Sequence, residues 1–330
     1  MTKNRMLTRF AALSVAALLL CGTAVADPFH RWSPDLGRLK TSADVTTVGM
    51  PKHSSHGRDT ELGWLDVAAK GFIPVMQRDL LEWSVQPHFS WRSMEGSAYL
   101  EDVGERLPDD LYEIGVGTTL RMKLTNGWIV GANLDISSPS DKPFASHDEM
   151  AISTTAFLQM PWKESLDLVA MVDLSNDRSF ARCVPLPGGA LHYYPSKEFD
   201  LFLGMPLSSV RWQPIDDLTL SARWLLLRDF NAKVSYRIFG PLSAYASFDW
   251  GSDTWLRHDR HHEAHRLTYR DKRVAAGLRW FVSDNVWVDA SAGWAWDRFW
   301  YEGEDYSDRD KNRIKLEDGC FGQLRVGVRF

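Results

Sequence analysis

The densest cluster of possible metal ligands lies between residues 258 and 265, which read His-Asp-Arg-His-His-Glu-Ala-His. Imidazole and carboxylate groups are common ligands of divalent metals. In a zinc protease, two histidines flank three residues that begin with the glutamate, and the stretch from His262 to His265 has one residue too few. We therefore predict an exposed loop, with no metal and no cofactor.

A second cluster is acidic and consists of Glu302, Glu304, Asp305, Asp308 and Asp310. Calcium favours carboxylate oxygens, but an EF-hand loop needs regularly spaced acidic residues and a central glycine. The run instead contains Arg309, Lys311 and Arg313. The pattern predicts a solvated surface loop.

Nucleophilic catalysis would need a serine or cysteine placed beside a base. The sequence shows no nucleophile elbow and no recognisable triad spacing. His192, beside Tyr193 and Tyr194, is the one histidine that the pattern places on the inner face of a strand, where a packing or pairing role is the commoner one. We predict that the protein is not an enzyme.

The elements that carry these residues have the period of strands. Between residues 112 and 124, apolar side chains alternate with polar or very small ones, and Asn126-Gly127 then turns the chain. The same alternation returns in residues 128–137, 218–226, 232–250, 273–280 and 286–297. Short turns alternate with long charged connections, which we place at 92–109, 138–148, 174–187, 251–266 and 301–317.

The N-terminus predicts export. Lys3, Arg5 and Arg9 precede an apolar stretch, and Ala24-Val25-Ala26 offers a signal-peptidase site. We predict a cleaved signal peptide at 1–26, a polar segment at 27–60 with at most one strand near residues 44–50, and a barrel at 61–330. Cleavage leaves Cys183 and Cys320, which either form a disulfide near the outer rim or stay free.

Composition narrows the class of protein. The chain has 330 residues, a formal net charge of −5, and 15 Trp. The charge predicts no nucleic-acid partner. No internal run of eighteen apolar residues is present, which argues against a transmembrane helix. Several apolar stripes run for nine to thirteen residues, as a membrane-spanning strand requires, and tryptophans gather towards strand ends, including Trp128, Trp250, Trp280, Trp294 and Trp296.

The C-terminus agrees, because residues 323–330 alternate and the chain ends on Phe330. A strand that ends on an aromatic residue resembles the signal by which the Gram-negative assembly machinery recognises outer-membrane barrels. Lipid cannot satisfy an open sheet edge, so the sheet must close. We predict an all-β fold, a transmembrane antiparallel β-barrel of 12–16 strands. Periplasmic turns would be short, extracellular loops longer, and both termini periplasmic.

The chain then resembles a family. Leu107-Pro108-Asp109-Asp110-Leu111-Tyr112, the segment Asn126-Gly127-Trp128, the proline-punctuated hairpins at 185–250 and the closing strand look like an uncharacterised, porin-like family of Gram-negative outer-membrane proteins. The resemblance covers residues 60–330. It implies the fold and an outer-membrane location, and it carries no site residues.

The inner faces predict a charged lumen. The expected lining residues are Glu113, Arg121, Lys123, Asn133, Asp135, Arg223, Lys233, Arg237, Asp249, Arg279, Asp289, Arg325 and Arg329. Charged walls keep a pore wet and bias its ion selectivity, and the excess of Arg and Lys predicts a weak anion preference. The favoured function is a passive pore or solute transporter. The alternatives are a closed surface barrel with a filled lumen and, less favoured, a lipid hydrolase. The expected partners are outer-membrane lipid, the assembly machinery and small solutes.

Overall fold

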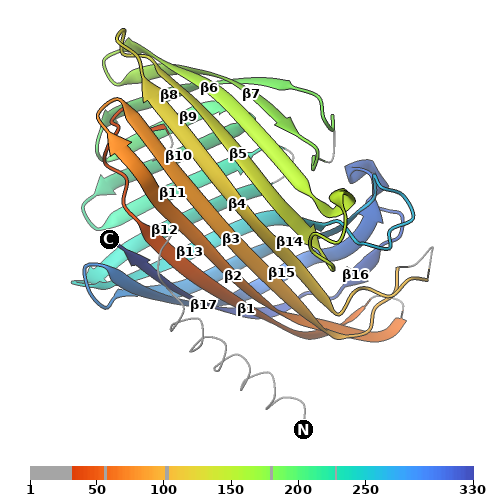
Figure 1. Ribbon diagram of the computed structural model, residues 1–330. Coiled ribbons are helices and arrows are strands. Elements are labelled where there is room, and N and C mark those ends of the chain that lie inside the picture. Colours follow the sequence, from red (N-terminus) through yellow and green to blue (C-terminus); the bar gives the residue numbers. More distant parts are fainter. Residues whose placement is uncertain (1–31, 56–57, 101–103, 179–180, 227–228) are drawn as a thin grey trace.

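The computed structural model describes residues 32–55, 58–100, 104–178, 181–226 and 229–330. Within these ranges almost every element is an antiparallel strand (Figure 1). The predicted signal peptide, residues 1–26, lies outside the described residues. Among the described residues, no helix has the length and apolar character to cross a membrane.

The strands differ widely in length. They are β1 (Ser42–Ser55), β2 (Arg58–Arg78), β3 (Leu81–Gly96), β4 (Asp110–Lys123), β5 (Ile129–Ser140), β6 (Ala151–Lys163), β7 (Leu166–Ser175), β8 (Leu186–Ser196), β9 (Phe199–Met205), β10 (Leu207–Ile215), β11 (Leu218–Leu225), β12 (Asp229–Phe239), β13 (Leu242–Trp255), β14 (Arg266–Phe281), β15 (Val286–Gly303), β16 (Ile314–Leu316) and β17 (Gly319–Arg329). Two single-turn 3-10 helices, His147–Glu149 and Tyr306–Asp308, lie in connections.

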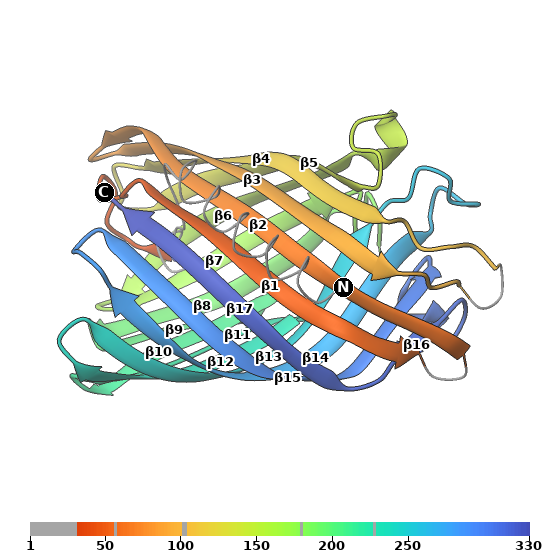
Figure 2. The same cartoon turned by 90° about the horizontal axis from the view of Figure 1, so that it is seen from below.

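The sheet closes on itself through the first and last long strands. β1 pairs with β2 on one side and with β17 on the other, so that Ser42 lies opposite Arg329 and Gly49 opposite Gly322 (Figure 2). Strands β1 to β15 together with β17 form a closed 16-strand barrel, while β16 is a short addition that pairs with β15 and β1. The predicted fold class and the upper strand number are confirmed.

The predicted start of the barrel is wrong. The barrel begins at Ser42, inside the segment 27–60, because the one strand considered near residues 44–50 is present as β1 and is part of the barrel wall, and β2 begins at Arg58. Strands also run into the predicted connections at 92–109, 251–266 and 301–317, because the inward positions of these extensions are covered by packing inside the barrel. Charge alone was therefore a poor guide to where these strands end.

The two ends of the barrel differ. At one end, here called the turn end, β1 starts, β17 stops and short turns such as residues 79–80 join the strands. At the other, the loop end, lie the long connections 97–109, 141–150, 176–185, 256–265 and 304–318. The loop-end wall is uneven, since Pro206 alone separates β9 from β10 and β9 has only seven residues, against 21 in β2.

The outer surface of the wall is apolar. On β4, Ile114, Val116 and Leu120 are exposed on the outside, whereas Thr119 and Arg121 are buried on the inside. The predicted two-faced stripe of this strand is therefore confirmed. An apolar outer face and a polar inner face are the reverse of a soluble protein and are the pattern of a barrel in lipid.

Aromatic residues on the outer wall form two levels. Near the turn end, Trp83, Trp128, Trp162, Trp212 and Trp280 are exposed. A second row crosses adjacent strands in register as Trp224, Phe230, Trp250, Lys272 and Trp296. On β14, residues 280 and 272 mark the two levels and are eight residues apart, or roughly 26 Å along the strand and roughly 20 Å in height at a tilt of about 40°. This height is close to the apolar band of about 25 Å that aromatic girdles flank in membrane barrels.

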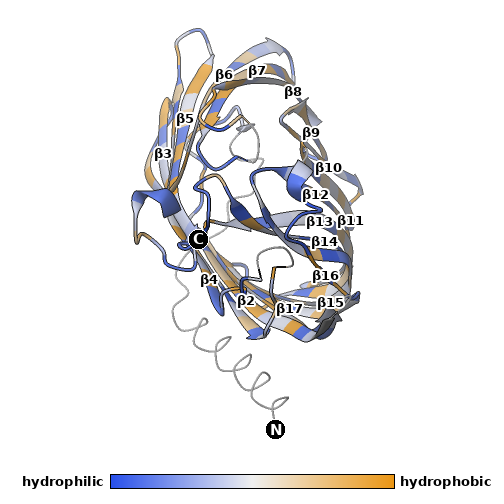
Figure 3. Cartoon of the chain, turned by 90° about the vertical axis from the view of Figure 1, so that its right-hand side faces the viewer, coloured by the Kyte–Doolittle hydropathy of each residue, from blue (hydrophilic) through white to orange (hydrophobic). Residues whose placement is uncertain are grey.

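Part of the lumen is filled near the loop end by an apolar core. Trp64, Trp255 and Trp300 on the barrel wall pack with Leu100 and Leu107 of the β3–β4 connection. Seen along the axis in Figure 3, connections also project across the interior of the ring. This core fixes the loop end of strands β1 to β3 and β13 to β17, which hold most of the charged residues described next.

Candidate functional site: a charged cavity inside the barrel

The barrel encloses a cavity of about 670 Å³ with a charged wall. Nine carboxylates line it, namely Asp44, Asp66, Glu113, Asp177, Asp229, Asp249, Asp253, Asp271 and Asp289. Six cationic side chains join them, namely Lys70, Arg92, Lys233, Arg273, Arg279 and Arg325. The lining therefore has an acidic excess of three formal charges.

One group of lining residues lies on β1, β12, β13, β14, β15 and β17. Arg279 Nη2 donates to Asp289 Oδ2 at 2.9 Å, and Lys233 Nζ lies 3.9 Å from the same oxygen. Tyr245 donates its hydroxyl to the other oxygen of Asp289, and Arg325 donates to Asp44. These carboxylates are buried, so the cations that face them offset much of the cost of their burial.

A second group is built around Arg92, whose side chain is buried on β3. Its guanidinium donates to Asp66 Oδ2 at 3.0 Å and to Asp253 Oδ2 at 2.7 Å. Four rings surround it, those of Trp64, Trp255, Tyr269 and Trp300, with ring centroids 4.7 to 5.5 Å from the guanidinium carbon. Arg92 thus joins the charged cavity to the apolar core.

A third group on β3, β4 and β5 contains His88 between two carboxylates. Its Nε2 lies 3.7 Å from Glu113 Oε1 and its Nδ1 lies 3.8 Å from Asp135 Oδ2. These separations exceed hydrogen-bond length, so no hydrogen bond joins the imidazole to either carboxylate.

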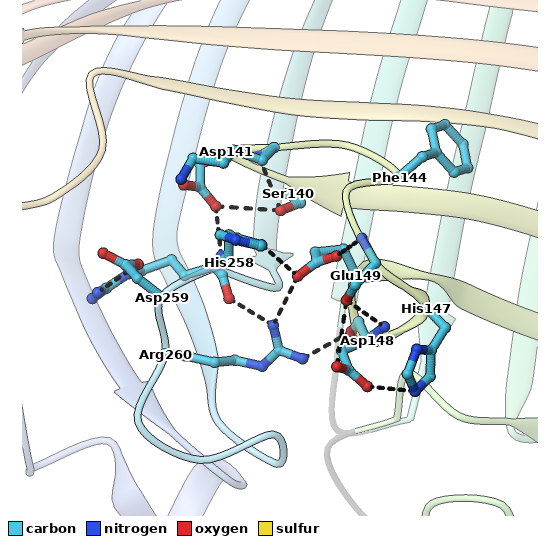
Figure 4. Close-up of polar contacts among 12 residues, drawn as sticks. Ser140, Asp141, Phe144, His147, Asp148, Glu149, His258, Asp259 and Arg260 are labelled. Atoms are coloured by element: carbon cyan, nitrogen blue, oxygen red, sulfur yellow. Dashed lines mark hydrogen bonds and ion pairs between the residues drawn. The ribbon is translucent and has the colours of Figure 1, made fainter.

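Two connections from opposite walls meet over the loop end. The β5–β6 connection and the β13–β14 connection are joined by backbone and side-chain contacts that we call the loop latch, formed by Asp141, Asp148, Glu149, His258 and Arg260 (Figure 4). Strands β5 and β13 are eight strands apart in the barrel. The loop latch therefore spans the mouth.

Glu149 is the centre of the loop latch. Its buried carboxylate accepts from the backbone N–H of Ser146 at 2.6 Å and lies 3.0 Å from His258 Nδ1 and 4.0 Å from Arg260 Nη1. Arg260 also donates to the carbonyl of Asp148 at 2.8 Å. Burial acts to raise the pKa of Glu149, but the hydrogen bonds from Ser146 and His258 outweigh it and hold the pKa below its usual range.

At the turn end, the chain before β1 runs along the inner wall. Residues 32–41 are here called the N-terminal strap. Leu39 N–H donates to Gln77 Oε1 at 2.8 Å, and Glu82, Arg121 and Gln159 form further hydrogen bonds to the strap. Gln159 Nε2 donates to the carbonyl of Trp32 at 3.0 Å. The strap thus crosses from β2 to β6 inside the barrel and places Trp32 against the far wall.

The structure brings six of the thirteen predicted lining residues to the cavity. Glu113, Lys233, Asp249, Arg279, Asp289 and Arg325 line it. Arg121 is buried against Glu82 and the N-terminal strap, and Asp135 lies beside His88. Asn133 donates to Thr119. Arg237 pairs with Asp217 near the turn end, and Lys123, Arg223 and Arg329 do not line the cavity.

Sequence reasoning missed several lining residues. Asp44, Arg92 and Asp253 lie in segments that it assigned to the polar N-terminus or to connections, and Asp66 lies in a part of the predicted barrel where it described no alternation. A signal was present, because the alternation that places Asp249 inward continues through residues 251 and 253. The observed lining has more carboxylates than cationic groups, the reverse of the predicted excess of Arg and Lys, because carboxylates were missed and several predicted cationic residues lie off the cavity.

The histidines singled out in the sequence do not gather at one site. His258 contacts Glu149, His261 Nε2 lies 2.7 Å from Glu105 Oε1, and the rings of His262 and His265 are tilted against each other with centroids 4.8 Å apart. Within the described residues, no group of three His, Cys, Asp or Glu could hold a metal ion. His192 is buried on β8, with Nε2 3.2 Å from Asp200 Oδ1.

The two cysteines do not form the disulfide that we considered. Both are free and exposed. Cys183 lies in the β7–β8 connection, whereas Cys320 is on β17 opposite Trp294 of β15. Because β7 and β17 lie in different parts of the wall, the two sulfur atoms are not brought together.

Comparison with solved structures finds outer-membrane barrels at low sequence identity. An outer membrane channel from Pseudomonas putida F1 has a TM-score of 0.38 and 13% identity, with 93% of this chain and 100% of that chain covered. The TodX monoaromatic hydrocarbon channel, as a deltaS2 mutant, has a TM-score of 0.41 and 10% identity, with 91% of each chain covered. The translocator domain of the autotransporter NalP from Neisseria meningitidis has a TM-score of 0.31 and 10% identity, with 100% and 97% covered. No family model and no curated protein matches the chain.

Proposed function

We propose that this protein is an outer-membrane channel for small solutes, exported by a signal peptide at residues 1–26 and without a catalytic step. The observation that carries the proposal is the 670 Å³ cavity inside the barrel, lined by nine carboxylates and six cationic groups. A wall of both signs holds water and ions in the lumen. The apolar outer wall with two aromatic levels supports a membrane location.

The acidic excess of the cavity favours cations. This replaces the weak anion preference inferred from the sequence, because Asp44, Asp66, Asp253 and other lining carboxylates were then uncounted. An excess of negative groups raises the local concentration of cations and lowers that of anions. The preference is modest, since many of the carboxylates already face an arginine or lysine.

Single-channel recording of the unboiled, detergent-purified protein in a planar bilayer tests the proposal, with boiled protein as the control. We expect discrete conductance steps and a reversal potential that indicates cation preference under a salt gradient. Asp249→Asn, on the cavity wall, should weaken this preference, whereas Asp305→Asn, in an exposed connection, should not. Silence from folded protein that still shifts on boiling in a gel, both as the wild type and after the loop latch is broken by substitution, would refute the channel.

A closed surface barrel is the second candidate. The loop latch across one mouth and the N-terminal strap at the other favour it. In that case the folded protein stays silent even after the loop latch is broken by substitution. Recording the Glu149→Ala variant therefore separates a gated channel, which conducts, from a sealed barrel, which does not.

A further inference from the structure

A second apolar cluster lies on the inner wall, apart from the core near the loop end, and Trp32 of the N-terminal strap occupies it. The patch, here called the Trp32 seat, is formed on β6 to β10 by Phe157, Val169, Met171, Phe202, Ala190 and Leu207. The indole stacks on Phe202 with a centroid distance of 4.7 Å and meets Phe157 edge-on at 5.0 Å. Stacked and edge-on contacts of this kind are specific for a flat aromatic ring.

Polar groups beside the Trp32 seat are arranged around two unused acceptors. Gln159 is fully buried, and its side-chain amide donates one hydrogen bond to Asp167 at 2.6 Å and one to the carbonyl of Trp32. Both partners can only accept, so the amide orientation is determined and Oε1 is left as an acceptor. Within the part of the chain that the structure describes, Gln159 Oε1 has no hydrogen-bond partner.

His192 supplies the second acceptor. Its ring is tilted against Phe202 at 6.0 Å, and Nε2 faces the carboxylate of Asp200, which can only accept. In the tautomer that donates through Nε2 to Asp200, Nδ1 is an acceptor. This atom is also buried and, among the described residues, has no hydrogen-bond partner.

We propose that the Trp32 seat is a binding site for a small aromatic molecule that carries one N–H or O–H donor, such as an indole or a phenol, and that this molecule displaces Trp32. The ring of the ligand takes the place of the indole between Phe202 and Phe157. Its donor satisfies Gln159 Oε1, which Trp32 leaves unused. A pocket with an apolar wall and few directed polar atoms is the usual form of a small-molecule site.

The inference deepens the proposed function and rests on it in one respect. The Trp32 seat faces the lumen, so a molecule bound there is one that the channel admits. The N-terminal strap then competes with the solute for the same surface. The apparent affinity for the solute scales with the fraction of molecules in which Trp32 has left the seat.

Binding is measured by fluorine NMR with full-length mature protein in detergent micelles, using 5-fluoroindole and its N-methyl derivative as probes. The two differ in one donor, and one hydrogen bond of about 1 kcal/mol predicts roughly fivefold tighter binding of 5-fluoroindole. Trp32→Ala vacates the Trp32 seat and should tighten binding of both probes about tenfold or more, as expected from the burial of one large apolar side chain.

Two variants test the location. Phe202→Ala should weaken both probes, whereas Phe248→Ala, on the outer wall, should leave them unchanged. Gln159→Met keeps the side-chain volume and should abolish the difference between the probes. Equal affinities of the probes for both the wild type and Trp32→Ala, or binding insensitive to Phe202→Ala, would overturn the proposal and indicate partition into the micelle.

Conductance of the same samples separates this inference from the channel. Donor-dependent binding without conductance refutes the channel and leaves the Trp32 seat. Conductance without donor-dependent binding refutes the Trp32 seat and leaves the channel.

Discussion

The loop latch gives the sharpest prediction, which concerns Glu149→Ala. This buried carboxylate contacts both His258 and Arg260 of the opposite connection. Glu149 also accepts a hydrogen bond from the N–H of Ser146 at the start of the 3-10 helix, and the substitution removes this bond. The substitution therefore weakens the contact across the mouth and the local fold of the β5–β6 connection together.

The size of the effect follows from these three contacts. The bond to His258 at 3.0 Å is charge-assisted but partly exposed, and contributes about 1 kcal/mol after screening by solvent. The pair with Arg260 at 4.0 Å contributes about 1 kcal/mol, and the capping bond to Ser146 about 1 kcal/mol. A total loss of about 3 kcal/mol raises the population of the open loop latch roughly 100-fold.

Hydrogen exchange of the backbone amides reads out this opening directly. The N–H groups of Leu256 and His258 are bonded to Pro139 and Asp141 across the mouth, so their protection should fall by about two orders of magnitude. Glu304→Gln, an exposed glutamate in the β15–β16 connection, is the matched control and should change neither amide.

Unchanged exchange in both connections of the Glu149→Ala variant would refute this reasoning. It would mean that the backbone bonds alone keep the two connections together. A global loss of protection, including the barrel strands, would refute it in another way, because Glu149 contacts no barrel strand beyond the end of β5.

Three further predictions follow. The loop latch should persist from neutral pH to about pH 5 and open below about pH 4. The lowered pKa of Glu149 gives stability that is present above the usual glutamate pKa and is lost as the pH falls through the pKa of the folded state. Hydrogen exchange corrected for its intrinsic pH dependence measures this opening, and opening only above neutral pH would contradict the prediction. Arg92→Ala removes the buried guanidinium that pairs with Asp66 and with the half-exposed Asp253, and should lower the free energy of unfolding by about 2–3 kcal/mol in urea titrations, after allowance for screening of Asp253 by solvent. A loss under about 1 kcal/mol would show that water replaces the guanidinium. Deletion of Phe330 should lower the amount of barrel in the outer membrane without preventing refolding in detergent, and an unchanged amount in membrane fractions would remove its role as an assembly signal.

The barrel could be predicted from the sequence because its cause is local. Each strand has its own alternation of apolar and polar residues, as residues 112–124 show. The short turns are determined by adjacent residues such as Asn126 and Gly127. The limits appeared where strands continue past the membrane into packed connections. There the outward face is no longer apolar, so the alternation that marks residues 249 and 253 as one face was read as a charged loop.

The cavity and the Trp32 seat depend on distant parts of the chain and were only partly predictable. Alternation places Arg279 and Asp289 on inner faces, but only register pairs them. Trp32 and Phe202 are far apart in sequence and meet because the N-terminal strap crosses the lumen. No local pattern encodes that crossing, and polar residues 27–60 gave no sign of it.

The uneven wall has a consequence for the membrane around the protein. β9 has seven residues, or roughly 23 Å along the strand, and a tilt of about 40° reduces this to roughly 18 Å of height. The apolar band of a barrel is about 25 Å tall, so the lipid leaflets beside β9 to β11 must thin or the whole barrel must lean towards that side. Either response costs a fraction of a kcal/mol per ångström and is relieved by shorter-chain lipids or by another protein with a low wall. The protein thus favours particular lipid neighbours, those with shorter chains, around one sector of its circumference.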